Sequence, residues 1–472
     1  MRAWAATSSV PRVTAQRQGS ASEMTAPDLS SLASSLSGRL TLPDDPAFDA
    51  ERSPWNLSID QRPVAVAHPD GLGDLRAILV AARDAGVTVA VQPSGHGAFS
   101  ALERSILVRT AAFDRFDIDP DARVATIGAG VTWGPVIDAL DGTGLVIPSG
   151  TSRVVTPAGY LTGGGHSWLS RWAGLGAQSL RAAWILRPDG THERVDDASD
   201  PDAMWALRGA GGLVGIVTQL EVDLLEAPSM VGGVLSFDAA DGPAVFRAVR
   251  DAAADAPEGL GAFVSSMRMP DAPMLPERIR GRSFVTVEVL ARSESDLGLL
   301  EGLRAAATPT EERLGPITQA GMAAMSTEPE EPFPGGGSSH ALAELPDAAI
   351  DDFFAWRSRE EQWPLVGFTL RMLGGVLDEP ARPAFATLAG ASWISHSLVP
   401  QFPGTPVEPG LESLAGLDAL LRPHLAERMA PTFLGPGETL ERCASAGDIE
   451  RLRSIRDAAD PDGVLHEGRL PR

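Results

Sequence analysis

Apolar and polar positions follow two different patterns along the first half of the chain. Short apolar, β-branched runs typical of strands occur at 62–67, 87–91, 105–109, 123–130, 179–186 and 218–225, and 192–195 is expected to return against 179–186 as a hairpin. Apolar residues recur at helical spacing over 73–85 and 133–140, and a short helix is predicted at 202–207. This mixture predicts an α+β fold.

The second half of the chain changes character at about residue 228. Strands are predicted at 231–237, 262–269, 283–292 and 366–373, with helices at 243–254 and 296–306 between them. This order favours an antiparallel sheet backed by helices. Residues 1–48 are rich in Ser, Ala, Thr and Pro and are expected to form a disordered leader. We therefore expect a leader (1–48), a first domain (49–227), a second domain (228–430) and a C-terminal segment (431–472).

Period-two alternation assigns side chains of the second domain to the two faces of its sheet. The valines of 284–290 share one face and should pack against helices, so Glu288 should point to the other side, toward a cavity. The same rule groups Thr369 with Arg371, and Ser266 with Arg268. Glu288 and Arg371 could act as base and substrate clamp, or they could form a structural ion pair. His340 is a further candidate base, or simply a loop residue.

Three glycine-rich turns interrupt the strands of the first domain. The first, 92–97, presents His96 between Gly95 and Gly97, whose missing Cβ atoms allow backbone to approach a ligand closely. The others lie at 150–175 and 208–218. Neither is a dinucleotide fingerprint, and a Walker loop needs a lysine that is missing. Each turn alone could be a hinge and His96 a surface histidine, but three turns in one domain favour a ligand cradle.

Composition removes several classes of function. The formal net charge of −23 disfavours nucleic acid as a partner. The sequence contains no lysine, which excludes Schiff-base chemistry, and the single Cys443 excludes an intrachain disulfide, iron–sulfur clusters and Cys-rich zinc sites, so we expect no metal. Tyr160 is the only phenol. Without an apolar run of 18 residues or a secretory signal, we expect a cytoplasmic protein that does not bind membranes.

Four motifs, taken in order over 50–227, resemble the FAD-binding domain of the vanillyl-alcohol-oxidase superfamily, in its berberine-bridge-enzyme-like branch. They are Trp55-Asn56, the Gln-Pro-Ser-Gly-His-Gly turn at 92–97, the Ala-Gly…Gly-Gly-Gly run at 158–175 and the Trp-Ala-Leu-Arg-Gly segment that opens 205–218. The tail segment 460–466 resembles the closing segment of the family more loosely. The resemblance implies a PCMH-type FAD-binding domain of two α+β subdomains, to which the C-terminal segment returns. It also implies a substrate domain whose free sheet face covers the flavin.

The resemblance further implies that the cofactor is FAD and that it is bonded covalently to His96, through a neutral imidazole. Gln92, Pro93 and Ser94 depart from the family's first turn. Ser152 stands where some members carry a second attaching cysteine, which excludes double attachment. The residues expected to bind the cofactor are Gln92, Pro93, Ser94, Gly95, His96, Gly97, Ala98, Ser152, Val155, Thr156, Gly159, Thr162, Gly163, His166, Gly215 and Val217. His166 could instead be a hydrogen-bonded turn histidine.

The resemblance implies an FAD-dependent oxidase that transfers hydride from a small organic substrate, an alcohol, an amine or an activated C–H compound, with dioxygen as acceptor. Phe433 falls where many relatives have a phenol, so the paired phenols that serve as base elsewhere are missing. We therefore expect a carboxylate or histidine, Glu288 or His340, to act as base with Arg371 as substrate clamp, or else the substrates differ from those of the sugar-oxidising members. A dehydrogenase with another acceptor, or a catalytically idle protein of the same fold, remains an alternative.

Overall fold

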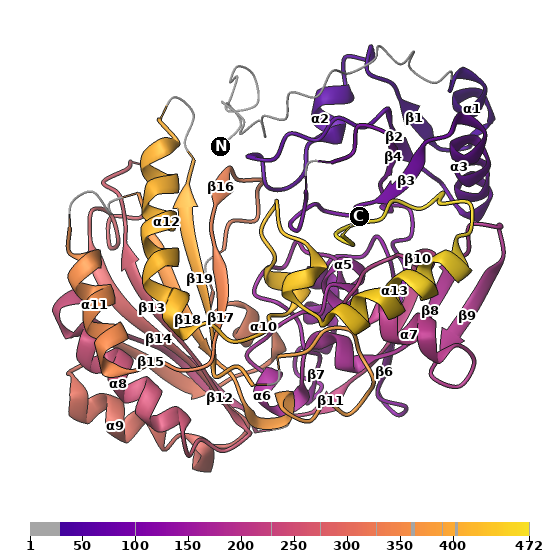
Figure 1. Ribbon diagram of the computed structural model, residues 1–472. Coiled ribbons are helices and arrows are strands. Elements are labelled where there is room, and N and C mark those ends of the chain that lie inside the picture. The colour runs from indigo at the N-terminus through magenta and orange to yellow at the C-terminus, as the bar shows by residue number, and fades with distance from the viewer. Residues whose placement is uncertain are drawn as a thin grey trace.

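A four-stranded sheet begins the fold in the computed structural model, which describes residues 29–99, 101–227, 229–273, 275–326, 328–359, 364–388, 390–401 and 405–471 (Figure 1). Its strand order is β1 (Arg39–Thr41), β2 (Ala65–His68), β4 (Ser105–Val108) and β3 (Thr88–Val91), with β1 antiparallel and the others parallel. The helices α1 (Ser30–Ser35), α2 (Phe48–Arg52) and α3 (Leu72–Ala85) accompany it. Apolar residues of α3 and β2 share one core.

The prediction of a disordered leader is wrong for residues 29–48. Leu29 and Leu32 are buried in the same core as α3, and β1 pairs with β2. The carboxylate of Asp74 in α3 accepts hydrogen bonds from the backbone N–H groups of Ser37 (2.9 Å) and Gly38 (2.8 Å). The composition of this segment is polar, but its few leucines pack against α3, which lies later in the chain. Local composition does not reveal such a contact. Residues 1–28 lie outside the described part.

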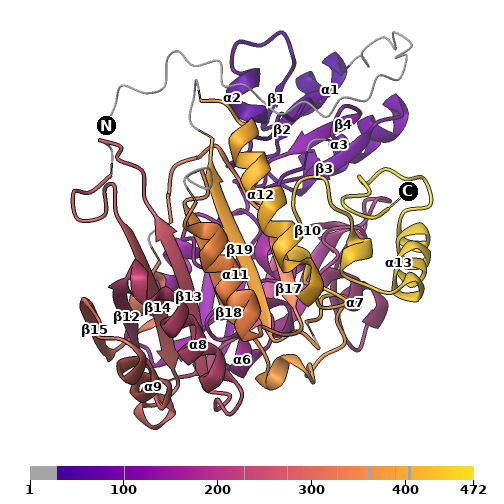
Figure 2. The ribbon, with the colours of Figure 1, turned by 60° about the vertical axis from the view of Figure 1, so that its left-hand side comes forward.

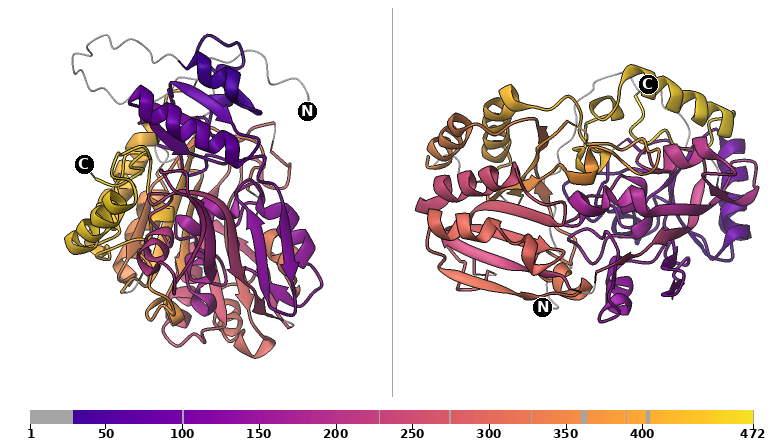
Figure 3. Two further views of the ribbon diagram at one scale, coloured as in Figure 1. Left: turned by 90° about the vertical axis from the view of Figure 1, so that its right-hand side faces the viewer. Right: turned by 90° about the horizontal axis from the view of Figure 1, so that it is seen from below.

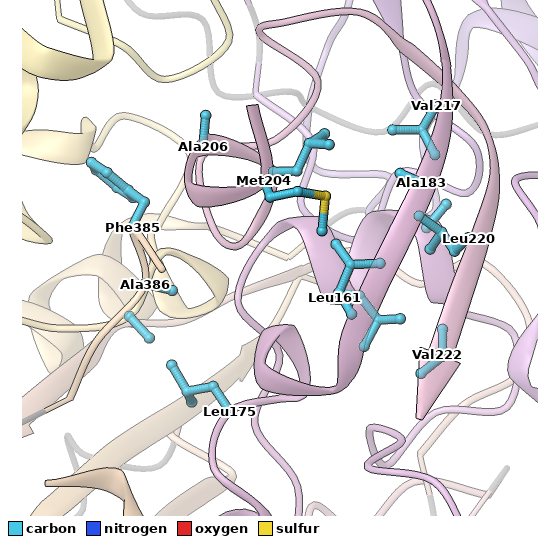
Figure 4. Close-up of a cluster of buried hydrophobic side chains, with 14 of the residues drawn as sticks. Leu161, Leu175, Ala183, Met204, Ala206, Val217, Leu220, Val222, Phe385 and Ala386 are labelled. Atoms are coloured by element: carbon cyan, nitrogen blue, oxygen red, sulfur yellow. The ribbon is translucent and has the colours of Figure 1, made fainter. Parts of the chain in front are cut away.

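A second sheet of five antiparallel strands completes the first half of the chain. Its order is β5 (Phe116–Asp119), β6 (Val124–Gly128), β10 (Ile216–Asp223), β8 (Leu180–Leu186) and β9 (His192–Asp196), and the short pair β7 (Leu145–Val146) and β11 (Leu225–Glu226) lies outside it. The helices are α4 (Trp133–Leu140), α5 (Pro157–Thr162), α6 (Ser170–Ala173) and α7 (Pro201–Leu207). Figure 4 shows Leu161, Met204 and Leu220 in the apolar core that they share.

The second half of the chain forms an eight-stranded antiparallel sheet, in which the sequence predicts four of the strands and the antiparallel arrangement. Its order is β15 (Glu311–Pro316), β12 (Val231–Asp238), β14 (Ser283–Ala291), β13 (Leu260–Arg268), β18 (Gly367–Met372), β19 (Trp393–Pro400) and β16 (Gly335–Gly336), and β17 (Ser339–Leu342) also pairs with β19. One face is covered by α8 (Gly242–Ala253), α9 (Leu299–Ala306), α11 (Asp347–Arg357) and α12 (Glu408–Leu421) (Figure 2). The mixed α+β fold class is thereby confirmed.

The remaining elements connect the two halves, which lie side by side (Figure 3). Helix α10 (Gln319–Ala323) contacts α4, and Gln319 Nε2 donates to Ser149 Oγ at 3.0 Å. Helix α13 (Ala446–Ala459) contacts α7, and the strand-like pairing of Leu465 with Val89 brings the C-terminal segment to the first sheet. Short 3₁₀ turns occupy 176–179, 239–241, 294–296, 375–377, 422–424, 431–433 and 440–442. Within the described residues, no helix combines the length and apolarity needed to cross a bilayer.

Arg171 of α6 joins the first half of the chain to the ends of two strands of the large sheet. The buried guanidinium donates from Nε to the Leu260 carbonyl at 2.8 Å, from Nη2 to the Ala256 carbonyl at 3.0 Å, and also to the Leu373 carbonyl. Buried carbonyls that lose a charged donor are left without a partner, which costs free energy. Arg171 therefore fixes where the large sheet sits relative to the second glycine-rich turn.

Replacing Arg171 with Met is expected to lower the free energy of unfolding by about 3 kcal/mol, because several buried carbonyls lose a cationic donor at once. Calorimetry or a thermal melt followed by circular dichroism measures the change. Arg181→Met is the matched control, since the Arg181 side chain is half exposed and its nearest carboxylate oxygen, on Asp223, is 3.8 Å away. Equal thermal midpoints for the two variants would contradict this role.

Candidate active site

The candidate active site lies on the face of the large sheet that the helices leave uncovered. Antiparallel pairing places Phe263 of β13 opposite both Glu288 of β14 and Arg371 of β18. Directly opposed residues share a face of the sheet, so these three side chains lie on one side. Val285, Val287 and Val289 lie on the other side, fully buried in the helix-covered core. The predicted orientation of Glu288 thus agrees with the observed register.

Glu288 is a carboxylic acid held in an apolar environment. Its Oε2 accepts a hydrogen bond of 3.2 Å from Nε1 of Trp168, which follows the glycine run of the second turn. Burial raises the pKa of Glu288 to about 7, although the positive charge of Arg371 and the Trp168 hydrogen bond both act in the opposite direction. A carboxyl group with this pKa can accept or release a proton near neutral pH.

Arg371 is a guanidinium without a polar partner. It lies over the rings of Phe263 and Phe433, with its Cζ 4.9 Å and 5.6 Å from their centroids. Its Nε is buried without a hydrogen-bond acceptor among the described residues, and burial lowers its pKa. Glu288 and Glu328 attract Arg371, but neither forms an ion pair with it in the part of the chain that the structure describes. The alternative of a structural Glu288–Arg371 ion pair therefore does not hold.

His396 is a site residue that the sequence did not reveal. It lies on β19 opposite Thr369 and Ser339, and its Nδ1 is 2.9 Å from Ser339 Oγ. The residue is exposed to solvent, yet desolvation by surrounding protein and the charge of Arg371 lower its pKa to about 4. Residues 393–399 read Trp-Ile-Ser-His-Ser-Leu-Val, whose three central polar residues interrupt any period-two pattern, and no nearby motif pointed to the histidine.

Three other residues that the sequence singled out, His340, Ser266 and Arg268, lie on the helix-covered face. His340 of β17 is opposite Ser395, and its Nε2 is 2.7 Å from Oδ1 of Asp418 in α12. Arg268 donates to the Arg357 carbonyl of α11 at 2.6 Å, and Ser266 is buried on the same side of β13. His340 is therefore removed from the candidates for catalysis. Successive residues of a strand point to opposite faces, and on β17 it is Ser339, not His340, that lies on the uncovered face with His396.

His96 lies in the first turn, stacked on Trp55. The ring centroids are 4.2 Å apart with planes inclined by 17°, and Nδ1 is 3.1 Å from Ser94 Oγ. The Nε2 atom is buried without a partner among the described residues, and burial lowers the pKa of His96 to about 4. The imidazole is therefore neutral at physiological pH. Gly95 has φ +85°, and a Cβ there would lie 2.7 Å from Cβ of Pro54.

Hydrogen bonds from Arg109 and between Gln61 and Gln92 hold the backbone of the first turn in place. The Arg109 guanidinium donates to the carbonyls of Gln92 (3.0 Å), Glu51 (2.9 Å) and Ser53 (3.0 Å). The side-chain amides of Gln92 and Gln61 exchange two hydrogen bonds of 2.9 Å. The Gln92 amide thus positions the turn. Arg109 ends a predicted strand, and nothing in its sequence context indicated this role.

The second turn is built around the ring of Tyr160. A Cβ added at Gly150, Gly165 or Gly176 would come within 2.9, 2.4 or 2.7 Å of that ring, so these glycines make room for a side chain of the protein itself. The Tyr160 hydroxyl is buried near Ser167 without a hydrogen bond of good geometry, and burial raises its pKa. The only phenol of the chain therefore stays protonated.

Other predicted residues of the second turn bind backbone. Thr156 caps α5 by accepting from the Gly159 N–H at 3.3 Å, and the Thr162 hydroxyl donates to the Ala158 carbonyl at 2.7 Å. The Gly163 N–H donates to the Gly159 carbonyl, and the Val155 carbonyl accepts from the Trp133 N–H. Ser152 is buried. These contacts shape the turn and leave its loop backbone as the surface a ligand could meet.

His166 is not a hydrogen-bonded turn histidine. It is buried, and neither ring nitrogen has a partner among the described residues. Its ring centroid lies 5.7 Å from that of Phe263 and 5.6 Å from that of Phe433, and burial together with the charge of Arg371 lowers its pKa. His166 thus belongs to the same cluster as Arg371, at the junction of the second turn and the large sheet.

The third turn and the C-terminal segment connect the glycine-rich turns. The Gly211 N–H donates to the Thr162 carbonyl at 3.0 Å, which joins the third turn to the second. Arg469 donates to the carbonyls of Gly97 (3.2 Å) and Gly435. Ala98 of the first turn is buried. The C-terminal segment therefore ties the His96 turn to the 430–438 region, whose Pro431 lies beside Gly164 of the second turn.

Two predicted cofactor contacts of the third turn pack inward. The Val217 side chain belongs to the apolar core shown in Figure 4. A Cβ at Gly215 would lie 3.1 Å from the Leu186 carbonyl oxygen, so this glycine allows β10 and β8 to approach. Only their backbone is left for a ligand.

The residues at this junction fit FAD. His96 Nε2, both nitrogens of His166, Arg371 Nε and the Tyr160 hydroxyl are buried polar atoms without partners among the described residues. Such atoms are costly in a folded protein unless a bound molecule or water completes them. Loop backbone of the glycine-rich turns offers neutral N–H donors of the kind that bind a pyrophosphate. No cluster of metal-ligating side chains occurs in the described part of the chain.

Comparison with known proteins agrees with this assignment. Residues 63–196 match the family model described as an FAD binding domain. The FAD-dependent monooxygenase FUP4 of Fusarium proliferatum is 34% identical over 176 residues, 37% of this chain and 34% of that protein. (R)-6-Hydroxynicotine oxidase of Paenarthrobacter nicotinovorans is 30% identical over 206 residues, 43% of this chain and 45% of the enzyme. The match thus spans less than half of either relative.

A solved structure extends the likeness to nearly the whole chain. Berberine-bridge-enzyme-like protein 1 of Physcomitrella patens superposes with a TM-score of 0.81 at 17% sequence identity, covering 94% of this chain and 99% of that one. At this identity the likeness concerns the fold. Residues 63–196 therefore form an FAD-binding domain of the PCMH type, and the chain has the fold of the berberine-bridge-enzyme-like branch of FAD-linked oxidases.

Proposed function

We propose that this chain is an FAD-dependent oxidase that takes hydride from an alcohol, an amine or an activated C–H group of a small organic substrate. The observation that carries the proposal is Glu288, a carboxyl group with a pKa of about 7. It lies on the sheet face turned toward the FAD-binding half, beside Arg371. FAD held by the glycine-rich turns at the junction would accept the hydride, and dioxygen would serve as the final electron acceptor.

Glu288 is the proposed base. As hydride leaves the substrate carbon, the proton of the neighbouring O–H or N–H group moves to the Glu288 carboxylate. The Trp168 hydrogen bond holds the carboxyl group in place and stabilises its charged form. Tyr160 is protonated and buried, and the chain has no other phenol, so no tyrosinate competes for this role. The rings of Phe263 and Phe433 line the site with apolar faces beside Arg371.

His96 is the proposed point of covalent attachment. Burial keeps its imidazole neutral, and a neutral imidazole has the lone pair that bond formation to an electrophilic carbon needs. Ser94 and the Trp55 ring fix its orientation, and no described residue hydrogen-bonds Nε2 in competition. Arg109 holds the backbone of the same turn, so the imidazole is presented on a rigid support.

Replacing His96 with Ala is expected to abolish the covalent bond, so that yellow colour stays in solution when the protein is precipitated with acid. Wild-type protein should carry the colour into the pellet and show flavin fluorescence in a denaturing gel. His192→Ala is the control, because that ring bonds Thr218 in the second sheet. A coloured pellet from His96→Ala would rule out this attachment.

Replacing Glu288 with Gln is expected to lower the rate of flavin reduction by about 10²- to 10⁴-fold, as found when a general base is lost. The wild-type rate should rise with pH to a plateau above about pH 7, because only the ionised carboxylate accepts the proton. This rise should be missing from the residual rate of the variant. Stopped-flow absorbance under nitrogen measures it, and Thr286→Val on the same strand and face is the control. An unchanged rate in Glu288→Gln would exclude Glu288 as base.

Replacing Trp168 with Phe is expected to move the rise in rate to higher pH. The Trp168 N–H stabilises the Glu288 carboxylate, so its loss raises the pKa of Glu288 further, while Phe keeps the stacking on Phe263. The pH profile of flavin reduction reports the shift. Trp172→Phe is the control: the Trp172 ring lies under the Arg292 guanidinium, so this change should leave the pH profile unchanged. A shift to lower pH would contradict the role of the Trp168 bond.

Comparing turnover in air with turnover in the presence of a dye under nitrogen tests the choice of acceptor. An oxidase is expected to release one hydrogen peroxide per substrate oxidised in air. Turnover only with the dye would replace the oxidase by a dehydrogenase of the same fold.

A further inference from the structure

Arg371, a partly buried residue, differs from the buried arginines of the described residues. Arg109 donates to three carbonyls, Arg171 also donates to several, and Arg208 bonds both the Asp197 carboxylate and the Leu180 carbonyl. Arg357 donates to the carbonyls of Leu365 and Val366. These four guanidinium groups bond protein acceptors, and so does that of the fifth buried arginine, Arg52, which bonds the carboxylates of Asp49 and Asp60. Arg371 has no hydrogen bond or ion pair to any described residue, and its Nε is buried.

The groups around Arg371 do not neutralise its charge. His166 and His396 face it and are neutral at pH 7, and Tyr160 faces it as a protonated phenol. Glu288 is only partly ionised at this pH, and Glu328 is an exposed residue on another segment, whose carboxylate accepts from the Thr151 hydroxyl. A buried cation without a paired anion is costly. The site as a whole therefore favours a negatively charged ligand.

The surroundings of Arg371 also fix its geometry. The guanidinium lies over Phe263 and Phe433, and Phe263 is stacked on Trp168 with ring centroids 5.3 Å apart. Aromatic faces hold a guanidinium through cation–π attraction and leave its N–H edge for hydrogen bonding. That edge carries two parallel N–H donors, which match the two oxygens of a carboxylate. A single negative charge on a planar group is the ligand that this arrangement suits best.

We propose that Arg371 binds a carboxylate group of the substrate, so that the substrate is a small organic acid whose oxidised carbon lies within reach of Glu288. This assignment rests on the proposed function and narrows its substrate class. Arg371 and Glu288 lie on strands separated by β13, a span of about 10 Å at the usual strand spacing. The carboxylate and the oxidised carbon of one small molecule can occupy the two ends of such a span.

Binding of benzoate and of acetate to the holoprotein tests the assignment, with benzamide and acetamide as neutral partners of the same shape. Titration calorimetry at constant ionic strength measures each Kd, and the flavin absorbance provides a second signal. At least one acid is expected to bind at least tenfold more tightly than its amide. Arg371→Met should weaken binding of that acid at least tenfold and leave the amide unchanged. Arg313→Met, which changes an exposed arginine of the same sheet, should behave as wild type.

Other outcomes overturn the assignment. If each acid binds no more tightly than its amide, or if Arg371→Met retains the acid affinity, the substrate carboxylate is excluded. Retained acid affinity in Arg371→Met with a changed flavin reduction potential would assign Arg371 to the cofactor instead. Should Arg371→Met fail to fold, Arg371→Lys replaces it: it keeps the charge without the paired N–H edge, and acid affinity is expected to fall between wild type and the amide. A colourless protein that takes up no FAD would contradict the proposed function, and calorimetry would still decide for Arg371.

Discussion

The register of antiparallel pairing among β14, β13, β18 and β19 is the constraint on which the site depends. It places Glu288, Arg371 and His396 on one face, although they come from three strands that are far apart in the sequence. A slip of one residue in any of these pairs would turn a site residue toward the helices. The fully buried valines of β14 make such a slip costly, because each would leave the apolar core.

The glycine-rich turns serve two different physical purposes. In the first turn, Gly95 takes a positive φ and lets the backbone pass Pro54 closely. In the second turn, several glycines instead make room for the ring of Tyr160, so the only phenol of the chain is a structural element of the cofactor-binding half. The same local composition therefore supports a ligand-facing loop in one place and the packing of a side chain in another.

A chain without lysine relies on arginine for every permanent side-chain cation. Arg109 and Arg171 show the structural use of this side chain, in which one guanidinium satisfies several buried carbonyls that no secondary structure completes. Arg371 shows the second use, ligand binding, because its N–H groups have no acceptor among the described residues and can bond a ligand. Burial sets both behaviours: it makes unpaired carbonyls costly near Arg109 and Arg171, and it makes an unpaired cation a strong anion site at Arg371.

The sequence by itself determined many local features: most strands of the first half, four strands and two helices of the second half, the face on which Glu288 lies, the turn that presents His96 and the resemblance to FAD-linked oxidases. These follow from periodicity and short motifs, which depend on neighbouring residues. The sequence did not reveal β15, β17 or β19, or the helices α11 to α13. Only the tertiary structure decided that His340 lies on the helix-covered face, that His396 lies near Arg371 and that Leu29 and Leu32 pack against α3. It also decided that no ion pair joins Glu288 to Arg371 within the described residues. The reason is that alternation orients a residue on its own strand, whereas the partners it meets depend on which distant strands pair and in what register.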